Sequence, residues 1–144
     1  MPSKKRFIGC QYPLVKTPRG ILAQKKDVDQ IKADLLQLLL TNPGERVMLP
    51  EYGTPLRKLM FEPNDPVLEL ETRNVIVKSI ARWEPRIEIQ NVVVSSKVRQ
   101  DFLDRYDDGT EADHIMSVTI SFFDPLDITE IQELRLEVPI GGGQ

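Results

Sequence analysis

Apolar residues recur at steps of three and four along the segment after Asp27, which is the spacing of one face of an α-helix. Asp27 or Asp29 is suited to cap the start of this helix, and the turn residues Asn42-Pro43-Gly44 mark its end. The sequence therefore predicts a first helix from about Asp27, with an apolar face made of Val28, Ile31, Leu35, Leu38 and Leu39.

A second helix is predicted to begin at Asn64-Asp65-Pro66, where a capping side chain precedes a proline at the first helical position. Pro85 disfavours the helical conformation at Glu84, so this helix ends there and an extended segment begins at Arg86. The apolar stripe of the second helix is Leu68, Val75, Ile76, Ile80 and Trp83.

After Trp83 the period of the apolar positions falls to about two, which indicates β-strands. The first strand carries Ile87 and Ile89 and continues through Val92 to Val94 after an irregularity at Asn91. Two cleaner strands follow, and their apolar faces are Met116, Val118, Ile120 and Phe122 in one and Leu134, Leu136, Val138 and Ile140 in the other.

This order, helices first and strands last, predicts an α+β fold in which two main helices pack on a small, mainly antiparallel C-terminal sheet. We expect an extended N-terminal arm over residues 1–26, a single domain over 27–140 and a flexible glycine-rich tail over 141–144. The acidic stretch 99–114 contains Asp108-Gly109 and is predicted to be a charged hairpin.

The composition of this 144-residue chain limits the kinds of partner that it can bind. A net charge of −3 and a pI of about 5.3 argue against a nucleic acid. No apolar run has the length of a membrane span, and no secretory leader is visible at the N-terminus. Cys10 is the sole cysteine, so no intrachain disulfide can form, and we expect synthesis in a reducing, cytosolic compartment.

The chain shows no catalytic, cofactor-binding or metal-binding pattern. A glycosidase needs two carboxyl groups across a cleft, and nothing in the spacing of Glu45, Glu51, Glu62 and Glu84 selects a pair. In the acidic stretch, a calcium loop with Gly109 at its sixth position would place Tyr106 at the third and Ile115 at the twelfth, so the pattern fails. His114 has no partner for a triad, and no phosphate-binding glycine loop is present.

Two features carry geometric information about interactions. In the corner Glu84-Pro85-Arg86 the two charged side chains, two apart in an extended segment, point the same way; they form either a weak surface ion pair or a rigid docking point. The last predicted strand is an edge of the sheet, where another chain could pair. Alternatively its charges, Glu133, Arg135 and Glu137, protect that edge.

The segment TNPGERVMLPEYGTPLRKLMFEPND, residues 41–65, interrupts large apolar side chains with turn residues, so it fits neither helix nor strand. Its block GERVMLPEYGTPLRKLMFEP, combined with the Glu84-Pro85-Arg86 corner, resembles the small baseplate wedge subunit of contractile phage tails. That lysozyme-like, sheath-initiator family is shared with the baseplate of type VI secretion systems. The likeness covers roughly residues 20–140, and the N-terminal arm is similar to the phage members.

This resemblance implies two interfaces. The corner would dock on a helical core bundle formed by the larger wedge subunits. The C-terminal strands, residues 130–140 and with them 115–123, would receive the arms of the first ring of tail sheath protein by strand addition. The residues of the sheath-facing strand are then Leu134, Arg135, Leu136, Glu137 and Val138.

The resemblance also suggests a role for the irregular segment as a plug between the two helices and the sheet. Its bends and fixed points would be Gly44, Glu45, Arg46, Pro50, Gly53 and Pro55. Its packing would come from Val47, Met48, Leu49, Leu56, Leu59, Met60 and Phe61.

The function implied is structural rather than enzymatic, in the tail baseplate of a virion assembled in the cytoplasm of the bacterial host. A contact with the tail hub or tube is a further option. The alternatives are a peptidoglycan-cleaving, lysozyme-like tail enzyme and the equivalent subunit of a type VI secretion system or other contractile injection system.

Overall fold

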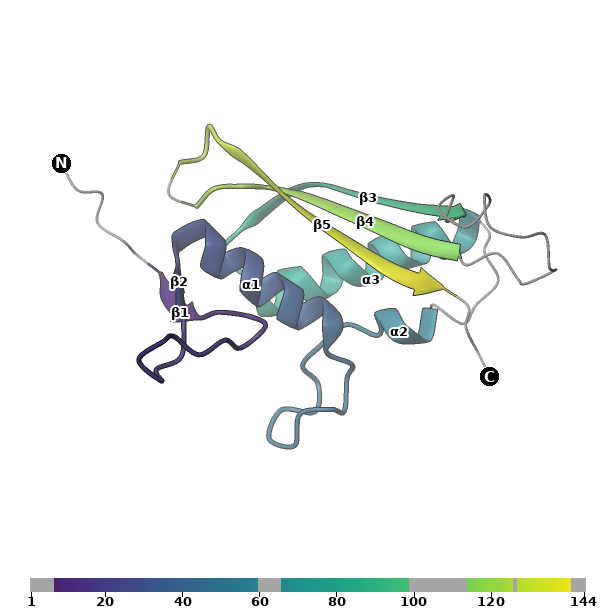
Figure 1. Ribbon diagram of the computed structural model, residues 1–144. Helices are drawn as coiled ribbons and strands as arrows, with labels where there is room; N and C mark the ends of the chain where they lie inside the picture. Colours follow the sequence, from purple (N-terminus) through teal and green to yellow (C-terminus); the bar gives the residue numbers. More distant parts are fainter. Residues whose placement is uncertain (1–6, 60–65, 99–113, 126, 141–144) are drawn as a thin grey trace, which may run out of the picture.

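The structure, a computed structural model, describes residues 7–59, 66–98, 114–125 and 127–140. Two long helices, α1 and α3, cover one face of a three-stranded sheet, and a small N-terminal hairpin lies beside the start of α1 (Figure 1). The α+β architecture predicted from the order of the elements is therefore confirmed, with both main helices on the same side of the sheet.

Helix α1 spans Asp27–Leu40 and buries the predicted face, with Ile31 and Leu35 fully inaccessible. The predicted cap is wrong, because the residue at the cap position is Lys26, which makes no side-chain capping hydrogen bond. Asp27 instead adopts a positive φ of 50° and exchanges hydrogen bonds with Phe7. The Asp27 carboxylate, which could have capped the helix, therefore accepts a hydrogen bond from Phe7 instead.

Helix α3 spans Pro66–Trp83, so it begins at the predicted proline and ends just before Glu84. Its buried stripe contains Leu68, Ile76 and Ile80, as the spacing predicted. Asn64 and Asp65, predicted to precede it as capping residues, lie outside the described residues.

A short helix, α2, spans Leu56–Leu59 and was not predicted. Its two end residues, Leu56 and Leu59, are buried, so one turn of helix brings both leucines onto the same side of the chain. The expectation that residues 41–65 contain no regular element is therefore wrong at this turn.

The sheet contains β3 (Glu88–Val98), β4 (His114–Phe123) and β5 (Ile131–Ile140), all antiparallel in the order β3-β4-β5. The irregularity predicted near Asn91 is present, since the β3–β4 register shifts between Ile89 and Asn91. The four alternate apolar side chains of β4 are fully buried, which confirms the predicted face. The predicted acidic hairpin between β3 and β4 lies outside the described residues.

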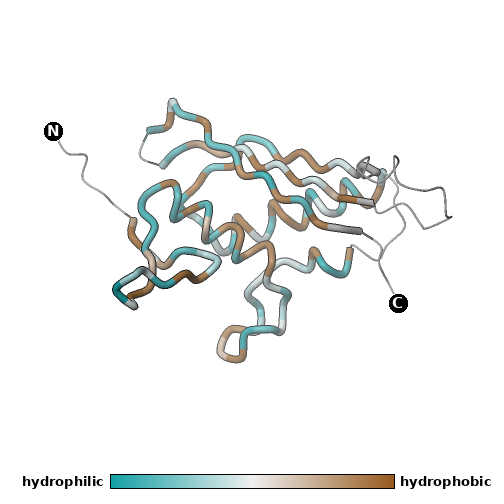
Figure 2. The backbone as a smooth tube through the Cα atoms, viewed as in Figure 1, coloured by the Kyte–Doolittle hydropathy of each residue, from teal (hydrophilic) through white to brown (hydrophobic). Residues whose placement is uncertain are grey.

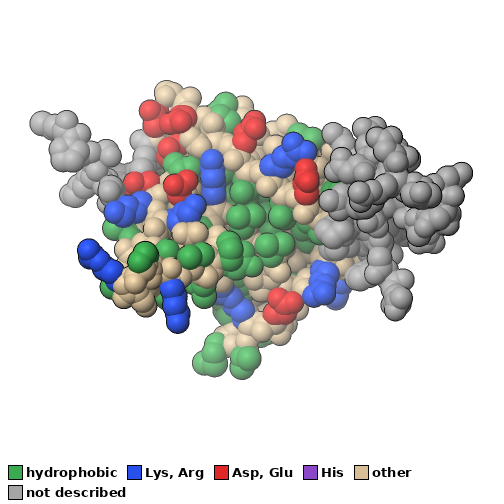
Figure 3. Space-filling model, in the orientation of Figure 1, with side chains coloured by type: hydrophobic (Ala, Val, Ile, Leu, Met, Phe, Trp, Pro, Cys, Tyr) green, Lys and Arg blue, Asp and Glu red, His purple; other side chains and the backbone are tan. Residues whose placement is uncertain are grey.

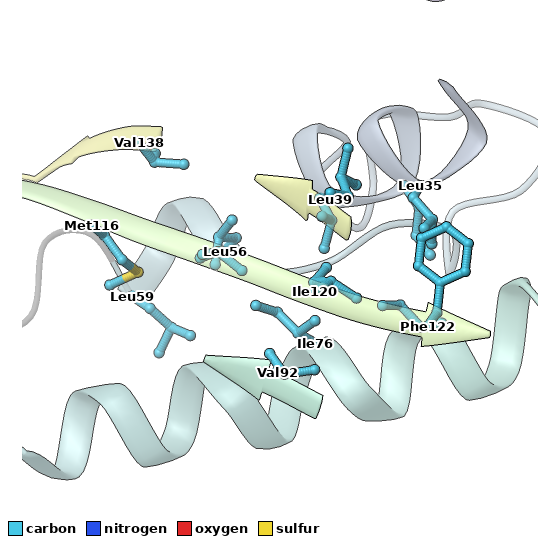
Figure 4. Packing of buried hydrophobic residues seen from close by; sticks show 14 of the residues in the cluster. Leu35, Leu39, Leu56, Leu59, Ile76, Val92, Met116, Ile120, Phe122 and Val138 are labelled. Atoms are coloured by element: carbon cyan, nitrogen blue, oxygen red, sulfur yellow. The ribbon is translucent and has the colours of Figure 1, made fainter. Parts of the chain in front are cut away.

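The core lies between the two long helices and the inner face of the sheet (Figure 4). Phe122 and Ile120 of β4 point toward Leu35 of α1 and Ile76 of α3, while Leu56 of α2 fills the space toward β5. Full burial of one such side chain contributes about 1.5–3 kcal/mol, so these contacts hold the helices against the inner face of the sheet.

Within residues 7–26, part of the predicted extended arm, the chain forms a small hairpin. Strands β1 (Ile8–Cys10) and β2 (Gln24–Lys26) pair antiparallel, and an isolated bridge joins Lys16 to Leu22 between them. Gly20, at a positive φ of 76°, supports the return of the chain. The hairpin then lies against α1, since a Cβ on Gly9 would lie 2.4 Å from the side chain of Gln30. The division into arm, domain and tail stays a prediction.

Within the described ranges, no helix is long and apolar enough to cross a membrane. The same residues contain no cluster of three or more histidine, cysteine or acidic side chains that could hold a metal ion.

Candidate interaction surfaces

The Glu84-Pro85-Arg86 corner forms the link between the end of α3 and the start of β3. Arg86 donates two hydrogen bonds to Glu84, from Nε to Oε1 and from Nη2 to Oε2, each 2.5 Å long. The two charged side chains therefore do lie side by side, in the bidentate arrangement that a guanidinium and a carboxylate favour.

The corner has a third charged member, Asp34 of α1, which sequence reasoning missed. Arg86 Nη2 lies 2.6 Å from Asp34 Oδ2, and Gln30 donates to Asp34 Oδ1 at 2.8 Å. Phe7 covers the guanidinium, with its ring centroid 5.2 Å from the Arg86 carbon. The sequence held one clue to the role of Asp34. Gln30 and Asp34 are one helical turn apart, next to the buried face of α1, so their side chains can meet.

Exposure differs sharply within the corner. The Glu84 side chain is 7% exposed, whereas that of Arg86 is 32% exposed and Pro85 is on the surface. The hydrogen bonds that Arg86 donates to Glu84, followed by the one it donates to Asp34, raise the pKa of Arg86, so the guanidinium stays charged. The corner therefore offers a fixed arginine edge and a proline to solvent, while the Glu84 carboxylate is used within the chain.

Residues 42–52, which we term the 42–52 loop, do not form the predicted plug. Figure 1 shows this loop projecting away from the helices on the side opposite the sheet, and Figure 2 shows hydrophobic residues at its tip. Val47 is 93% exposed and Met48 is 94% exposed. Gly44, Glu45 and Pro50 are exposed as well.

Three consecutive tight turns give the 42–52 loop its shape. They are closed by backbone hydrogen bonds from Glu45 to Asn42, from Leu49 to Arg46 and from Tyr52 to Leu49, at 3.1, 3.3 and 3.0 Å. A further bond of 2.7 Å from the Gly44 N–H to the Pro50 carbonyl ties the two sides of the loop together. These bonds give the loop a defined shape although its tip does not pack against the core.

Side chains anchor the base of the loop to the helices. Arg46 lies over the ring of Tyr52, with the guanidinium carbon 3.8 Å from the ring centroid. Tyr52 in turn meets Trp83 edge to face, with centroids 5.3 Å apart, and Glu51 forms an ion pair with Arg82. The loop is therefore attached to the end of α3, directly before the corner.

Glu45 closes the first turn with its side chain. Its carboxylate accepts a 2.8 Å bond from the Asn42 side-chain amide and a 3.0 Å bond from the Asn42 backbone N–H. These bonds hold the pKa of Glu45 below its usual value. The predicted role of Glu45 in fixing the start of the segment is consistent with this geometry, although the carboxylate fixes a projecting loop.

The part of the segment that does pack inward begins at Gly53. Gly53 has a φ of 123°, and a Cβ at this position would lie 2.3 Å from the Thr41 carbonyl oxygen. Thr54, Leu56 and Leu59 are buried after it, and Pro55 is half-buried. Met60 and Phe61, also assigned to the plug, lie outside the described residues.

Strand β5 is an edge of the sheet, and no strand among the described residues pairs with its outer side. Leu134 and Val138 face the core, while Arg135 and Glu137 form an exposed ion pair of 2.8 Å on the other face. The role proposed for residues 115–123 is wrong, because β4 is the central strand and is paired along both sides. Of the two strands considered for strand addition, only β5 has an unpaired side.

Of the four carboxylates considered for catalysis, the three that the structure describes each have a partner within the chain. Glu45 bonds Asn42, Glu51 pairs with Arg82, and Glu84 is held by Arg86; Glu62 lies outside the described residues. A glycosidase acid needs an apolar pocket that keeps it protonated, and none of the three described carboxylates has that environment. A hollow of about 330 Å³ between α3 and β3 contains a single acid, Glu69.

Comparison with known proteins supplies a family. The baseplate wedge protein gp25 family matches residues 25–122. Baseplate protein W of Escherichia phage P2 is 30% identical over 69 residues, which is 48% of this chain and 60% of that relative. The match thus spans less than two thirds of the phage protein.

Solved structures share the fold at low identity. A putative tail lysozyme from Geobacter sulfurreducens superposes with a TM-score of 0.61 at 19% identity, over 81% of this chain and 93% of that chain. A chain in the 6-fold symmetrised baseplate of the anti-feeding prophage has a TM-score of 0.60 at 20% identity, over 94% and 86%. At these identities the superpositions show a common fold and carry no residue roles.

Proposed function

The chain belongs to the baseplate wedge protein gp25 family, and from this premise we propose that it is a structural subunit joining two parts of a contractile phage tail. In this proposal the Glu84-Pro85-Arg86 corner docks on the core bundle of the larger wedge subunits, and β5 receives an arm from the first ring of sheath protein. The observation that supports it is the placement of the two features, because the corner leads into the edge strand β3 and the strand proposed for addition, β5, is the opposite edge of the same sheet.

The corner suits docking because Arg86 is already held in place. Two carboxylates, from Glu84 and Asp34, fix the guanidinium while about a third of its side chain faces solvent. A held arginine loses little rotamer freedom when a partner carboxylate or backbone carbonyl approaches it. Arg86 is therefore the contact residue in this proposal, and Glu84 and Asp34 position it.

Strand β5 suits addition of another strand because its ten residues run along an unpaired edge. Each main-chain hydrogen bond contributes only about 0.5–1.5 kcal/mol, but a series of bonds in register fixes the direction and spacing of the added strand. Repeated around a ring of subunits, such strands provide a template for the first sheath ring. The same ladder then holds the sheath to the baseplate during contraction.

The docking half is tested by mixing the purified chain with the larger wedge subunits and sheath protein encoded beside it, and imaging the products by electron microscopy. Arg86→Ala is expected to prevent incorporation into wedges. Arg135→Ala, which removes an exposed arginine from a different surface, is the matched control. Normal incorporation of Arg86→Ala, checked to be folded by circular dichroism, contradicts docking through the corner.

The sheath half is tested with two neighbouring prolines, Arg135→Pro and Leu136→Pro. Adjacent N–H groups of a strand point to opposite edges, so one variant removes a bond to β4 and the other removes an outward donor. The variant with the more native thermal stability identifies the outward donor, and it should assemble into wedges but fail to start sheath. Alanine at the same position controls for the lost side chain, and sheath growth on the folded proline variant sinks the proposal.

Two alternatives lead to different results. A peptidoglycan-cleaving enzyme would release muropeptides from purified cell wall and lose that activity in Glu84→Gln, whereas we expect no cleavage by the wild type. The equivalent subunit of a type VI secretion system or other injection system would assemble only with the wedge subunits of that system. Assembly in the host cytoplasm, and a contact with the hub or tube, also belong to the proposal. Adding purified hub and tube proteins to the same reconstitution tests the contact.

A further inference from the structure

The tip of the 42–52 loop exposes two large apolar side chains at the end of a structured projection. Val47 and Met48 are 93% and 94% exposed, and they are the two central residues of the middle turn. Figure 3 shows hydrophobic side chains projecting at the lower extremity of the molecule, beyond the main body. Single exposed apolar residues are common on protein surfaces, but this adjacent pair is held at the apex of a loop with a defined shape.

We propose that the 42–52 loop is a knob that inserts Val47 and Met48 into an apolar pocket of the larger wedge subunits. This inference rests on the proposed function for the identity of the partner, but it adds a contact that neither the corner nor β5 supplies. The pocket it requires is apolar and lies on a protein surface. The flexible thioether of Met48 can adapt to a pocket of irregular shape.

The position of the loop assigns it to the same partner as the corner. Tyr52 at the base of the loop packs on Trp83, and Trp83 is followed directly by Glu84. The ion pair between Arg82 and Glu51 joins the same two segments. A protein bound to Pro85 and Arg86 therefore lies next to the base of the 42–52 loop. The surface of the corner and the surface of the loop are then parts of one larger surface.

The charges around the tip favour a protein pocket over a phosphate-rich surface. The loop and its anchor carry Glu45 and Glu51 against Arg46 and Arg82, so the formal charges cancel. Arg46 lies over Tyr52 and Arg82 pairs with Glu51, so both cations already have partners within the chain. An anionic membrane attracts an excess of basic residues, and the described surface of the tip has none.

The chain's own contacts explain how the tip stays exposed without disturbing the fold. The Gly44 N–H to Pro50 carbonyl bond and the three turns close the loop below the tip. The Asn42 bonds to Glu45 fix the first turn. Substituting the tip residues therefore removes apolar surface while leaving the loop backbone and the core as they are.

The test is a binding measurement with the full chain. The probe is the purified complex of the larger wedge subunits encoded beside this chain, and the variants are Val47→Ser with Met48→Ser, and Met48→Lys alone. Ile128→Ser, at a residue 75% exposed in the turn between β4 and β5, is the control. Both tip variants should keep the wild-type melting temperature and weaken the complex by about tenfold or more, as loss of a buried apolar anchor does.

The outcomes separate this inference from the proposed function. If Arg86→Ala abolishes binding and the tip variants bind as tightly as wild type, the knob is overturned while the docking corner stands. If the tip variants weaken binding and Arg86→Ala does not, the knob is supported and docking through the corner fails. Equal losses in the tip variants and in Ile128→Ser overturn the knob, because the effect is then not local.

Two further measurements exclude other occupants of the tip. Sedimentation of wild type and of the double variant shows whether the tip binds a second copy of the chain. Flotation with vesicles of phosphatidylglycerol and phosphatidylcholine shows whether it enters a membrane surface. Tip-dependent self-association or flotation, without tip-dependent binding to the wedge complex, overturns the proposal, as does a wild-type chain that fails to bind that complex.

Discussion

At the residue scale, the corner depends on the shape of one guanidinium. Arg86 bonds Glu84 through two nitrogens and reaches Asp34 through one of them, so two carboxylates on different elements share a single planar fork. A lysine ammonium is a point charge without that fork. The arginine is therefore required both for the local fold, where it ties α1 to the start of β3, and for the docking proposed above.

Arg86→Lys should lower the free energy of unfolding by about 1–2 kcal/mol, because it leaves the nearly buried Glu84 carboxylate incompletely paired. Urea unfolding measures the change. The control is Arg135→Lys, whose pair with Glu137 has side chains 63% and 54% exposed, and which should cost less than about 0.5 kcal/mol. Equal effects in the two variants would show that burial of Glu84 contributes nothing.

The first turn of the 42–52 loop is sensitive to acid. The pKa of Glu45 is lowered by the hydrogen bonds from Asn42, so these bonds stabilise the turn above the unfolded-state pKa and are lost as the pH falls through the folded-state value. An NMR titration should show the Glu45 midpoint rising in Asn42→Ala. The midpoint of Asp127, lowered by its bonds with Thr129, should stay the same; an unchanged Glu45 midpoint contradicts the assignment.

At the element scale, the junction after the 42–52 loop requires a glycine. Gly53→Ala should destabilise the protein by roughly 2–6 kcal/mol, from backbone strain of ~1–3 and overpacking against the Thr41 carbonyl of ~1–3. Gly44→Ala, at a φ of 95° with open space around its Cβ position, carries strain alone and should cost about 1–2 kcal/mol. Thermal unfolding compares them, and a Gly53 variant no worse than the Gly44 variant refutes the steric argument.

The elements that could be predicted are those whose burial follows a period. The stripe of α3 from Leu68 to Ile80 and the alternation of β4 from Met116 to Phe122 were both readable, because each period brings the apolar residues onto one face. The 42–52 loop could not be read in this way. Val47 and Met48 look like packing material in the sequence, and only the structure shows that hydrogen-bonded turns carry them away from the core.

Side-chain partners that are distant in sequence were equally hidden. Asp34 reaches Arg86 across 52 positions, and Asp27 is taken by Phe7 across 20. From the neighbouring sequence alone, Asp27 was predicted to cap a helix and Asp34 was given no role. The pair between Glu84 and Arg86 was predictable, because residues two apart in an extended segment point the same way and Pro85 restricts the backbone between them.

At the scale of the whole molecule, the two surfaces proposed for docking and for strand addition lie at opposite edges of the sheet. The corner adjoins the end of α3 and leads into β3, whereas β5 is the opposite edge of the sheet. The 42–52 loop is anchored to α3 through Tyr52 and Trp83, and its first residue, Asn42, lines a hollow with Val138 of β5. The fully buried residues of β4 lie between those edges. A close-packed core of this kind holds both surfaces in a fixed relation.

This separation predicts that the two proposed interfaces bind independently. The affinity for a sheath arm should change less than about twofold when the wedge complex is already bound, because a coupling free energy requires an element with two arrangements. Titration of labelled sheath protein onto the free chain and onto the wedge-bound chain measures this. A change of tenfold or more would mean that the sheet transmits a rearrangement between its edges.

The three turns of the 42–52 loop have a thermodynamic consequence for association. A flexible loop loses conformational entropy when a partner orders it, at roughly 1–2 kcal/mol for each residue fixed. Here the turns have already removed that freedom during folding, so docking should proceed with a small entropy loss and a bound geometry present beforehand. A change that loosens the first turn, where Glu45 bonds Asn42, would then weaken the assembly through disorder in the unbound subunit without removing a tip residue.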